Sequence, residues 1–418
     1  MTPARLYPRT ALLVLTALNL LNYIDRSVLF GVQPLIQAEF HRSNADFGLL
    51  SSAFFFCYMF AAPFMGPLAD RYSRKRIIIV GAVLWSAATL LTALTHDFTT
   101  LFIRHTLVGI GEVSFATIAP TVVADLFAEN KRGRILGIFY LTIPVGTALG
   151  YLIGGYLAVR HGWRYPFLIC AAPGFLLAIL LSFIPEPERG MHDSLQQTPE
   201  RASFHGMLRN PAFWTATLGM AFMTFALGAL QVWIPTFLVR ERGYPLDRAN
   251  MIFSLIIVLD GTVASLAGGW LGDLLLPRIR SAYYLVSAAS MLLAVPLMVL
   301  AFQARGRTMI VAIFLGAFLV LFNTSPLNAA VINSVSARIR GTAIASNIFI
   351  IHLLGDASSP WIVGRLADHW SLAHAMLVTT PIAIALSSAI LFYGMKFAPA
   401  LAATATGDTQ QLGIASNR

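Results

Sequence analysis

The sequence predicts an all-α membrane protein, and three observations indicate this fold class: the composition, the apolar runs and an internal repeat. The 418 residues are 57% hydrophobic and only 11% charged, whereas an ordinary soluble domain is about 25% charged. Runs of about 20 apolar residues, the length that crosses a bilayer as a helix, recur along nearly the whole chain. We therefore expect twelve transmembrane helices in two pseudo-symmetric halves of six.

The predicted spans follow these apolar runs, with boundaries good to a few residues. They lie at 10–31, 47–69, 76–95, 98–124, 134–158, 164–184, 211–238, 249–271, 281–302, 308–330, 341–363 and 372–395. They divide the chain into an amino-terminal half at 1–184, a linker at 185–210, a carboxyl-terminal half at 211–396 and a tail at 397–418. Because the tail is small and polar, we expect it to be disordered.

The basic residues indicate how the chain is oriented. A net charge of +10 could suggest a nucleic-acid partner, but these residues are scattered over short loops and form no basic domain. About twice as many Lys and Arg fall in the termini and even-numbered loops as in the opposite loops, which places both termini in the cytoplasm. We expect a multi-pass protein of the bacterial inner membrane that binds no nucleic acid.

Two local patterns have simple explanations. Arg5 and Arg9 before an apolar run could suggest a signal peptide, but no small-residue cleavage site precedes Asn22 and eleven further spans follow. Cys57 and Cys170 both fall within apolar spans, so they imply neither a disulfide nor a metal framework. We expect no metal and no cofactor.

A glycine-rich acidic loop follows the second span and recurs after the eighth. The first copy runs from Gly66 to Asp70 and Arg71, with Arg74 just beyond, and the second copy ends at Asp273. In the same way, an Arg-Gly pair opens both the fifth and the eleventh spans. These two echoes, one half-chain apart, indicate that a unit of six spans has been duplicated.

Six plus six helices with this loop in each half resemble the major facilitator superfamily. The resemblance implies alternating access, in which one half rocks against the other around a site at the midplane. It also implies that the loop latches the cytoplasmic side, with Asp70 approaching the eleventh span and Asp273 the fifth. The alternative is that Arg71, Arg74, Lys75 and Arg76 are ordinary cytoplasmic anchors.

Four ionisable residues of the amino half lie inside predicted spans: Asp25, Arg26, Arg104 and Glu112. Each charge at the centre of a spanning helix costs about 2.5 to 3.5 kcal/mol, so such residues indicate a functional site. Asp25 and Arg104 reach similar depth and could pair. Glu112 lies about 12 Å lower than Arg104 and about 80° round the helix, so these two cannot form a salt bridge.

These four residues predict proton coupling. A carboxylate in a partly dry cavity can change its protonation as the cavity opens or as an arginine moves. The alternative is a static network that fixes the register of the helices. We favour transport, because four ionisable groups on two helices are a large cost for register alone.

Polar residues of the carboxyl half add candidates for the substrate cavity. Asp260 could line the cavity or cap a local break. His352 and Asp356 share one helix face and could hydrogen-bond or both point into the cavity. The polar run around Pro326 could satisfy the carbonyl that proline frees, or contact a ligand. The cavity candidates are Tyr23, Asn323, Asn328, Asn347, His352, Asp356 and Asp260.

One further pattern predicts packing rather than chemistry. Gly146, Gly150 and Gly154 recur every four residues in the fifth span. Small residues at this spacing let two helix backbones approach closely in a membrane. We therefore expect this stripe to face another helix and to need no substrate.

Four separated strings narrow the family. They are Asn-Tyr-Ile-Asp-Arg at 22–26, Gly-Ile-Gly-Glu-Val-Ser at 109–114 leading to Ala-Pro-Thr at 119–121, Asn-Thr-Ser-Pro-Leu-Asn-Ala-Ala at 323–330, and the run from Asn347 to Pro360. Together they resemble the Spinster family. The first string alone is also similar to one in anion:cation symporters for sugar acids, so the other three carry the assignment.

The Spinster resemblance implies a proton-linked carrier of lysophospholipids or sphingoid lipids. Carried over by motif, Asp25, Arg26 and Glu112 would couple protons to conformational change, with Arg104 nearby. Asp260 departs from the pattern that the resemblance implies, and an extra acid could alter the preferred charge of the substrate. Beyond lipid cargo, protons and the bilayer, we expect no partner, and we expect a monomer.

Three other function classes are an anion or drug carrier, an enzyme and a transport-inactive sensor. A carrier of small organic anions or drugs would use Arg26 and Arg104 as counter-ions for its substrate. An enzyme is disfavoured because no metal-ligand cluster, phosphate loop or nucleophile motif occurs in a suitable context, and a sensor would need an appended domain. A tall apolar cavity with a side opening toward lipid would favour an amphiphile, whereas a small polar pocket ringed by arginine would favour the anion carrier.

Overall fold

A computed structural model describes residues 3–189, 204–335 and 339–398 of the chain, and those residues form helices and no strands. Most of the predicted linker and nearly all of the predicted tail lie outside the described residues. The amino half contains α1 (Pro3–Phe40), α2 (Asn44–Arg71), α3 (Arg74–Ala93), α4 (Phe98–Leu126), α5 (Glu129–His161) and α6 (Arg164–Ser182). The predicted all-α membrane fold is confirmed.

The carboxyl half follows a short helix, α7 (Phe204–Leu208), in the predicted linker. It contains α8 (Pro211–Arg240), α9 (Leu246–Leu275), α10 (Ala282–Gln303), α11 (Gly306–Leu321), α12 (Thr324–Asn333), α13 (Arg340–Ile351), η2 (His352–Asp356), α14 (Ser359–His369), α15 (Leu372–Gly394) and η3 (Met395–Phe397). Within the described residues, eleven helical stretches are long and apolar enough to cross a membrane. The remaining predicted span, the eleventh at 341–363, is a broken helix.

The break in this eleventh span lies at a short π-helical segment, η2. Gly355 has φ −101° and ψ −107°, values outside the helical range. A Cβ atom at Gly355 would lie 2.8 Å from the Cβ of Thr224 on α8, so α8 packs directly against the break. The span predicted at 341–363 is present as α13, η2 and α14, and its interruption is a feature for which the apolar pattern carries no signal.

The tenth span bends where the sequence places Pro326. The α11 helix ends at Leu321 and α12 begins at Thr324. Proline cannot bond to the carbonyl four residues before it, here that of Phe322. A Cβ at Gly268 of α9 would clash with this carbonyl oxygen, so α9 covers the bend closely.

The glycine stripe of the fifth span packs against α1, as the sequence predicts. A Cβ at Gly146 would lie 2.6 Å from the carbonyl oxygen of Leu20, and one at Gly150 would lie 2.5 Å from that of Ile24. The backbones of α1 and α5 therefore touch over the turns that carry Asp25 and Arg26. This contact fixes the position of the charged segment of α1.

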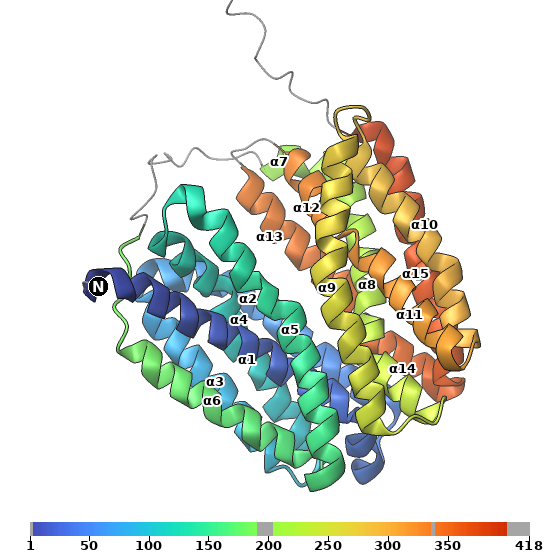
Figure 1. Cartoon of the computed structure of the whole chain (residues 1–418), viewed down its shortest axis with the longest axis horizontal. Coiled ribbons are helices and arrows are strands. Elements are labelled where there is room, and N and C mark those ends of the chain that lie inside the picture. The colour runs from blue at the N-terminus through green and yellow to red at the C-terminus, as the bar shows by residue number, and fades with distance from the viewer. Residues whose placement is uncertain (1–2, 190–203, 336–338, 399–418) are drawn as a thin grey trace, which may run out of the picture.

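The two halves meet at one end of the molecule and separate toward the other (Figure 1). We call the end that carries α7 the linker end, and the other the opposite end. At the opposite end, the backbone N–H groups of Asn44 and Ala45 donate to Asp368 over 2.8 and 2.9 Å. The amide of Asn250 donates to the carbonyl of Gly31 over 2.9 Å. The interface is therefore sealed at the opposite end, and α5 and α9 diverge toward the linker end.

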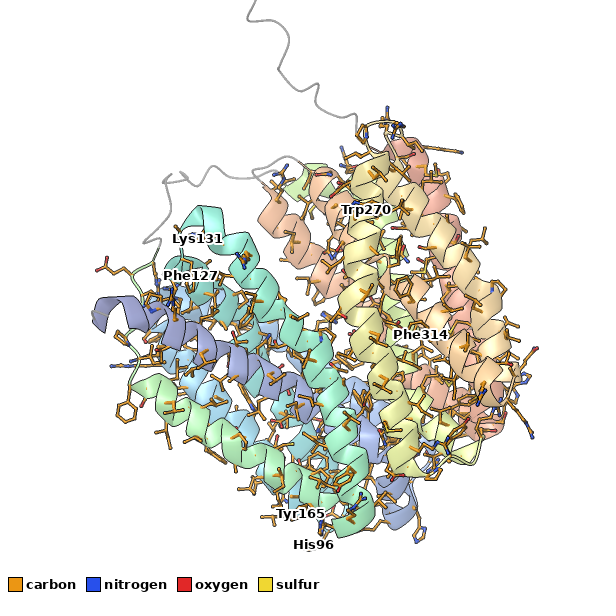
Figure 2. The ribbon with its side chains drawn as sticks, viewed as in Figure 1. His96, Phe127, Lys131, Tyr165, Trp270 and Phe314 are labelled. Atoms are coloured by element: carbon orange, nitrogen blue, oxygen red, sulfur yellow. The ribbon has the colours of Figure 1, made fainter. Side chains whose placement is uncertain are left out.

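Exposed aromatic side chains mark both ends of the bundle. Trp270 lies toward the linker end of α9, whereas Tyr165 lies at the opposite end, at the start of α6 (Figure 2). Trp270 is 66% exposed and Tyr165 is 36% exposed. Amphipathic rings at these two levels are typical of the two interfaces between membrane and water.

Candidate functional site

The centre of the amino half contains a buried ion pair between α1 and α4. The guanidinium of Arg26 donates to Glu112 Oε2 through Nη2 over 2.8 Å and through Nε over 3.2 Å. The side chain of Glu112 is 0% exposed and that of Arg26 is 14% exposed. The second carboxylate oxygen, Oε1, has no hydrogen-bond partner among the described residues. Glu112 thus has the neighbour that its position in an apolar span requires.

Aromatic rings enclose the charged end of Arg26. Its guanidinium carbon lies 5.1 Å from the ring centroid of Tyr23, 4.9 Å from that of Phe54 and 5.3 Å from that of Tyr58. Rings at this distance stabilise a cation through their negative faces, most strongly where water is excluded. Glu112 and the rings therefore hold Arg26 toward the interface between the halves. Tyr58 has no obvious sequence signal, and we did not predict it.

Asp25 lies apart from this ion pair, although it precedes Arg26 in the sequence. Its side chain is 3% exposed, and neither carboxylate oxygen has a hydrogen-bond partner among the described residues. The expected contact with Arg104 does not form, because Arg104 Nη1 donates to the carbonyl of Leu91 on α3 over 2.6 Å. Similar depth in the membrane did not bring the two side chains together, since they point to different neighbours.

A second charged pair lies in the carboxyl half at the break of the eleventh span. His352 Nδ1 lies 2.8 Å from Asp356 Oδ1, so of the two arrangements that the sequence leaves open, the hydrogen bond across one helical turn is present. The ring of Tyr58 on α2 lies edge-on to His352, with centroids 6.2 Å apart. The two charged pairs, one in each half, therefore face each other across Tyr58.

An apolar cleft of about 580 Å³ lies between the halves. It is bordered by α5, α8, α9 and the end of α11, and apolar side chains such as Ile138, Leu141 and Ile257 dominate its lining. On its rim, Ile138 is 49% exposed and Leu266 is 74% exposed. The rim of the cleft therefore offers an exposed apolar surface of the kind that can contact an acyl chain.

Asp260 is among the residues that line this cleft. Its side chain is fully buried, and both of its oxygens lack a hydrogen-bond partner among the described residues. The sequence leaves two roles open for Asp260, lining the cavity or capping a local break, and its position fits the first. The regular helix α9 runs from Leu246 to Leu275, so Asp260 caps no break.

The other cavity candidates divide into two groups. Asn323 is fully buried; its Oδ1 accepts from Ser290 over 2.9 Å and its amide donates to the carbonyl of Leu319 over 2.8 Å. Asn347 is buried too, and its amide lies 3.5 Å from the sulfur of Met220. Asn328 donates to its own helix. These amides serve the packing of the carboxyl half, whereas Tyr23 lies beside Arg26 at the interface.

The predicted latch residues make no contact between the halves within the described residues. The carboxylate of Asp70 is exposed and has no partner there, and Asp273 accepts from the hydroxyl of Tyr283 in its own half over 2.7 Å. Arg71 is exposed, and a Cβ at Gly66 would meet open space. This arrangement fits a latch that is released when the linker end is open.

Arg74 takes part in a different cluster from the one we predicted. It is buried, and its Nη1 lies 2.5 Å from Asp125 Oδ2 at the end of α4. Its backbone N–H donates to Glu186 over 2.8 Å, and Arg189 donates to the carbonyl of Asp70 over 2.6 Å. Arg74 therefore ties the start of the linker to the amino half and is not free to cross the interface. We did not predict Asp125 or Glu186. The sequence did offer a signal for both, because each acid lies just at or beyond the end of an apolar span and could pair with the basic loop around Arg74.

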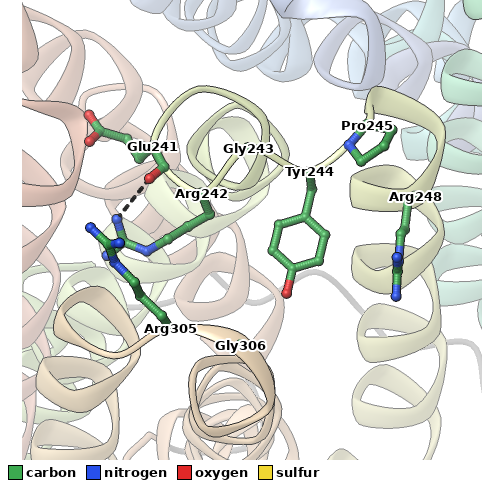
Figure 3. Close-up of a pocket in the computed structure, with 8 residues that line it drawn as sticks. All are labelled: Glu241, Arg242, Gly243, Tyr244, Pro245, Arg248, Arg305 and Gly306. Carbon is green, nitrogen blue, oxygen red and sulfur yellow. Dashed lines mark hydrogen bonds between the residues drawn. The ribbon is translucent and has the colours of Figure 1, made fainter.

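A basic pocket of about 480 Å³ lies at the opposite end of the carboxyl half. Figure 3 shows the side chains of Arg242 and Arg305 next to each other, with Arg248 beyond Tyr244. Burial and the neighbouring charge of Arg305 both lower the pKa of Arg242 from its ordinary value. The pocket is lined by the carboxyl half alone, so it is not the interface site that an anion carrier using the arginines of the amino half would need.

The chain is similar to proteins of one family. Residues 15–360 match the family model of the Major Facilitator Superfamily. The chain is 38% identical over 383 residues to protein spinster homolog 3 of Danio rerio, covering 86% of this chain and 77% of the relative. It is 36% identical over 388 residues to protein spinster homolog 1 of Homo sapiens, covering 86% and 73%.

Solved structures show the same fold. A bacterial homolog to the human lysosomal transporter Spinster, in an inward-facing and occupied conformation, matches with a TM-score of 0.80 at 23% identity over 95% of this chain and 96% of that one. A D-xylose-proton symporter matches with a TM-score of 0.77 at 18% identity over 94% and 98%. Because the identities are below 25%, these matches show that the helices are arranged in the same fold.

Proposed function

Because the chain belongs to the Spinster family of the major facilitator superfamily, we propose that it is a proton-coupled transporter of lysophospholipids or related amphiphilic lipids. Its family and fold make it an alternating-access transporter rather than an enzyme. The cargo and the coupling ion are the parts of this function that we propose. The observation that carries the choice of cargo is the apolar cleft between α5 and α9.

The cleft supports an amphiphile over a small organic anion. An acyl chain needs an apolar surface that it can reach from the bilayer, and the cleft offers one with an exposed rim at Ile138 and Leu266. A sugar acid needs a sealed polar pocket with free cationic groups. In the conformation described, Arg26 is paired with Glu112 and Arg104 is bonded to the backbone of α3, so neither offers a free counter-ion to a substrate while Glu112 is ionised.

The paired charges at the interface support proton coupling. A proton on Glu112 cancels its charge and removes the strongest acceptor of the Arg26 guanidinium. Arg26 is then free to turn toward Asp356 in the other half when the halves approach. Asp25, which is buried without a partner, supplies a second carboxyl that can carry a proton in the same half. Protonation thereby changes which contacts hold the two halves.

The orientation follows from the charge pattern. Basic residues crowd the linker end, where Arg71, Arg74, Lys75 and Lys131 are found. We place this end and both termini in the cytoplasm of a bacterial inner membrane, with halves at 1–184 and 211–396 acting as rigid bodies in a monomer. In this orientation the conformation described above faces inward.

A substrate panel in proteoliposomes tests the proposed function. The purified protein is reconstituted, and the movement of a lysophospholipid, a sugar acid and a cationic drug is measured with and without an imposed pH gradient. We expect the lysophospholipid to move and the gradient to accelerate it. Gradient-driven movement of the sugar acid alone would replace this function with that of an anion carrier, and equal rates with and without the gradient would remove the proton from the mechanism.

A further inference from the structure

Among the described residues, the cleft contains one acidic side chain, that of Asp260, which the proposed coupling mechanism does not use. It lies near the middle of α9, fourteen residues from Leu246 and fifteen from Leu275. The middle of a helix of this length lies near the midplane of the bilayer when the helix is centred in it. Its side chain is 0% exposed and neither oxygen has a hydrogen-bond partner in the described part of the chain. Burying an ion without a partner costs several kcal/mol. Two arrangements avoid this cost: the carboxyl carries a proton, as we propose for Asp25, or it meets a cation that the chain itself does not supply.

Three hydroxyls on the same side of the cleft are hydrogen-bonded to other groups. The hydroxyl of Thr262 donates to the carbonyl of Val258 over 2.6 Å, and the hydroxyls of Ser265 and Ser325 bond to each other over 2.9 Å. None of these hydroxyls is hydrogen-bonded to Asp260. The carboxylate is thus not the centre of a local network.

The nearest basic side chain in the cleft is too far away to neutralise Asp260. Asp260 lies at the level of Pro144 on α5, because the next residue, Gly261, packs against Pro144: a Cβ at Gly261 would lie 2.6 Å from the Cβ of Pro144. Arg134 is the only basic residue that lines the cleft among the described residues. It precedes Pro144 by ten residues, about 15 Å along α5 toward the linker end. Asp260 is therefore the single charge in the deep part of an apolar cleft.

We propose that Asp260 binds the cationic nitrogen of the head group of an amphiphilic cargo, such as a primary or quaternary ammonium. The ammonium contacts the carboxylate at the midplane, and the apolar chain occupies the cleft between α5 and α9 toward the lipid. A cation at this point satisfies the buried carboxylate, so cargo with an ammonium head is preferred over cargo without one. This assignment rests on the proposed function, because it specifies the charge of the same cargo.

Two lysophospholipids with the same acyl chain test this preference. Lysophosphatidylcholine carries a quaternary ammonium, whereas lysophosphatidylglycerol has no cationic nitrogen. Binding of each to the full-length protein in lipid nanodiscs is measured at equilibrium, and transport is measured in proteoliposomes. We expect the wild type to bind lysophosphatidylcholine about tenfold more tightly, the effect of one charge contact at this depth.

The Asp260→Asn variant should lose this tenfold preference while its affinity for lysophosphatidylglycerol stays within about twofold. Asp260→Glu should keep most of the preference, because it keeps the charge. The matched control is Asp247→Asn on the first turn of the same helix, outside the cleft, which should keep the full preference. Elution of each variant as a single peak in gel filtration confirms that it is folded.

The outcomes separate this inference from the function on which it rests. If Asp260→Asn weakens the binding of both lipids equally, or the binding of neither, Asp260 does not bind the ammonium of the head group and the inference is wrong. If the wild type transports neither lipid, the proposed function fails. The binding experiment still decides the role of Asp260 in that case, because it compares affinities and requires no transport.

Discussion

At the scale of single residues, Asp25 and Arg26 show how neighbours on a helix acquire different surroundings. Successive side chains on a helix point about 100° apart. Arg26 therefore faces α4 and the interface, where it meets Glu112, while Asp25 is buried without a partner among the described residues. The acid that neutralises Arg26 is thus the distant Glu112 rather than the adjacent Asp25.

We expect Glu112→Gln to abolish the acceleration of transport by a pH gradient. The amide keeps the shape of the side chain but carries no charge and exchanges no proton, so Arg26 is no longer controlled by protonation. Transport by the variant in proteoliposomes, with and without the gradient, measures the effect. Glu39→Gln is the matched control, because Glu39 pairs with Arg164 over 2.7 Å at the surface and should keep its response. A gradient response in Glu112→Gln as large as that of the wild type would remove Glu112 from the coupling.

The sequence identified which residues are unusual but not how they pair. Charges inside apolar spans are recognisable one by one, and this singled out Arg26, Glu112 and Asp260. Pairing depends on the rotation of each helix about its own axis, which the apolar pattern of a span does not determine when most faces are apolar. Arg104 and Asp25 could pair by depth, yet Arg104 is bonded to Leu91 in this conformation, and the contact of Arg26 with Glu112 emerged only from the packed helices.

At the scale of helices, the packing of α5 on α1 shows what a sequence pattern can predict. The glycine stripe predicted a close helix contact, and the carbonyls of Leu20 and Ile24 lie against it. The spans themselves were also predicted, because a bilayer imposes their length and composition. The break at Gly355 was not predicted, since it depends on the approach of Thr224 from α8, and a single glycine in an apolar run has many explanations.

We expect Gly150→Ala to destabilise the protein and Gly137→Ala, in the same helix, to leave its stability unchanged or to raise it. The new Cβ at position 150 would lie 2.5 Å from the carbonyl of Ile24 and 2.6 Å from the Cβ of Ser27, so α1 and α5 must separate. Overpacking of this kind costs about 1 to 3 kcal/mol. At position 137 the Cβ meets open space, and the better helix propensity of alanine is worth up to about 1 kcal/mol.

Thermal unfolding in detergent, followed for both variants beside the wild type, measures this difference. The transition of Gly150→Ala should fall by several degrees, and its transport should fall with it because α1 carries Arg26. Equal transitions for the two variants would mean that α1 and α5 are not in backbone contact.

At the scale of the whole molecule, the seal at the opposite end determines which conformation is populated. Asp368 on α14 accepts from the first N–H groups of α2, those of Asn44 and Ala45, and so acts as a helix cap between the halves. A capping carboxylate is worth about 1 kcal/mol. This contact exists only while the opposite end is closed, so it favours the conformation open at the linker end.

We expect Asp368→Ala to shift the population about fivefold toward the conformation open at the opposite end, because a loss of about 1 kcal/mol acts on one state alone. Distances between spin labels placed on the two halves at that end measure the shift. Asp247→Ala, an acid at the same end without a contact between the halves in the described residues, should leave the distance distribution unchanged. An unchanged distribution in Asp368→Ala would show that the cap does not hold the seal.

The latch at the linker end should act with the opposite sign. Asp70 is exposed, and in this conformation it has no partner among the described residues, so its removal costs this state nothing. If Asp70 approaches the eleventh span when the linker end closes, Asp70→Ala destabilises only the closed state and increases the population open at the linker end. Labelling of single cysteines across that end should become faster. Asp273→Ala should give a smaller increase, because Tyr283 already holds Asp273 within its own half. Labelling rates in Asp70→Ala equal to those of the wild type would contradict the latch and leave the acidic loop as an anchor at the membrane surface. The balance between the two conformations would then depend on the seal at Asp368 and on the ionisable pairs at the centre.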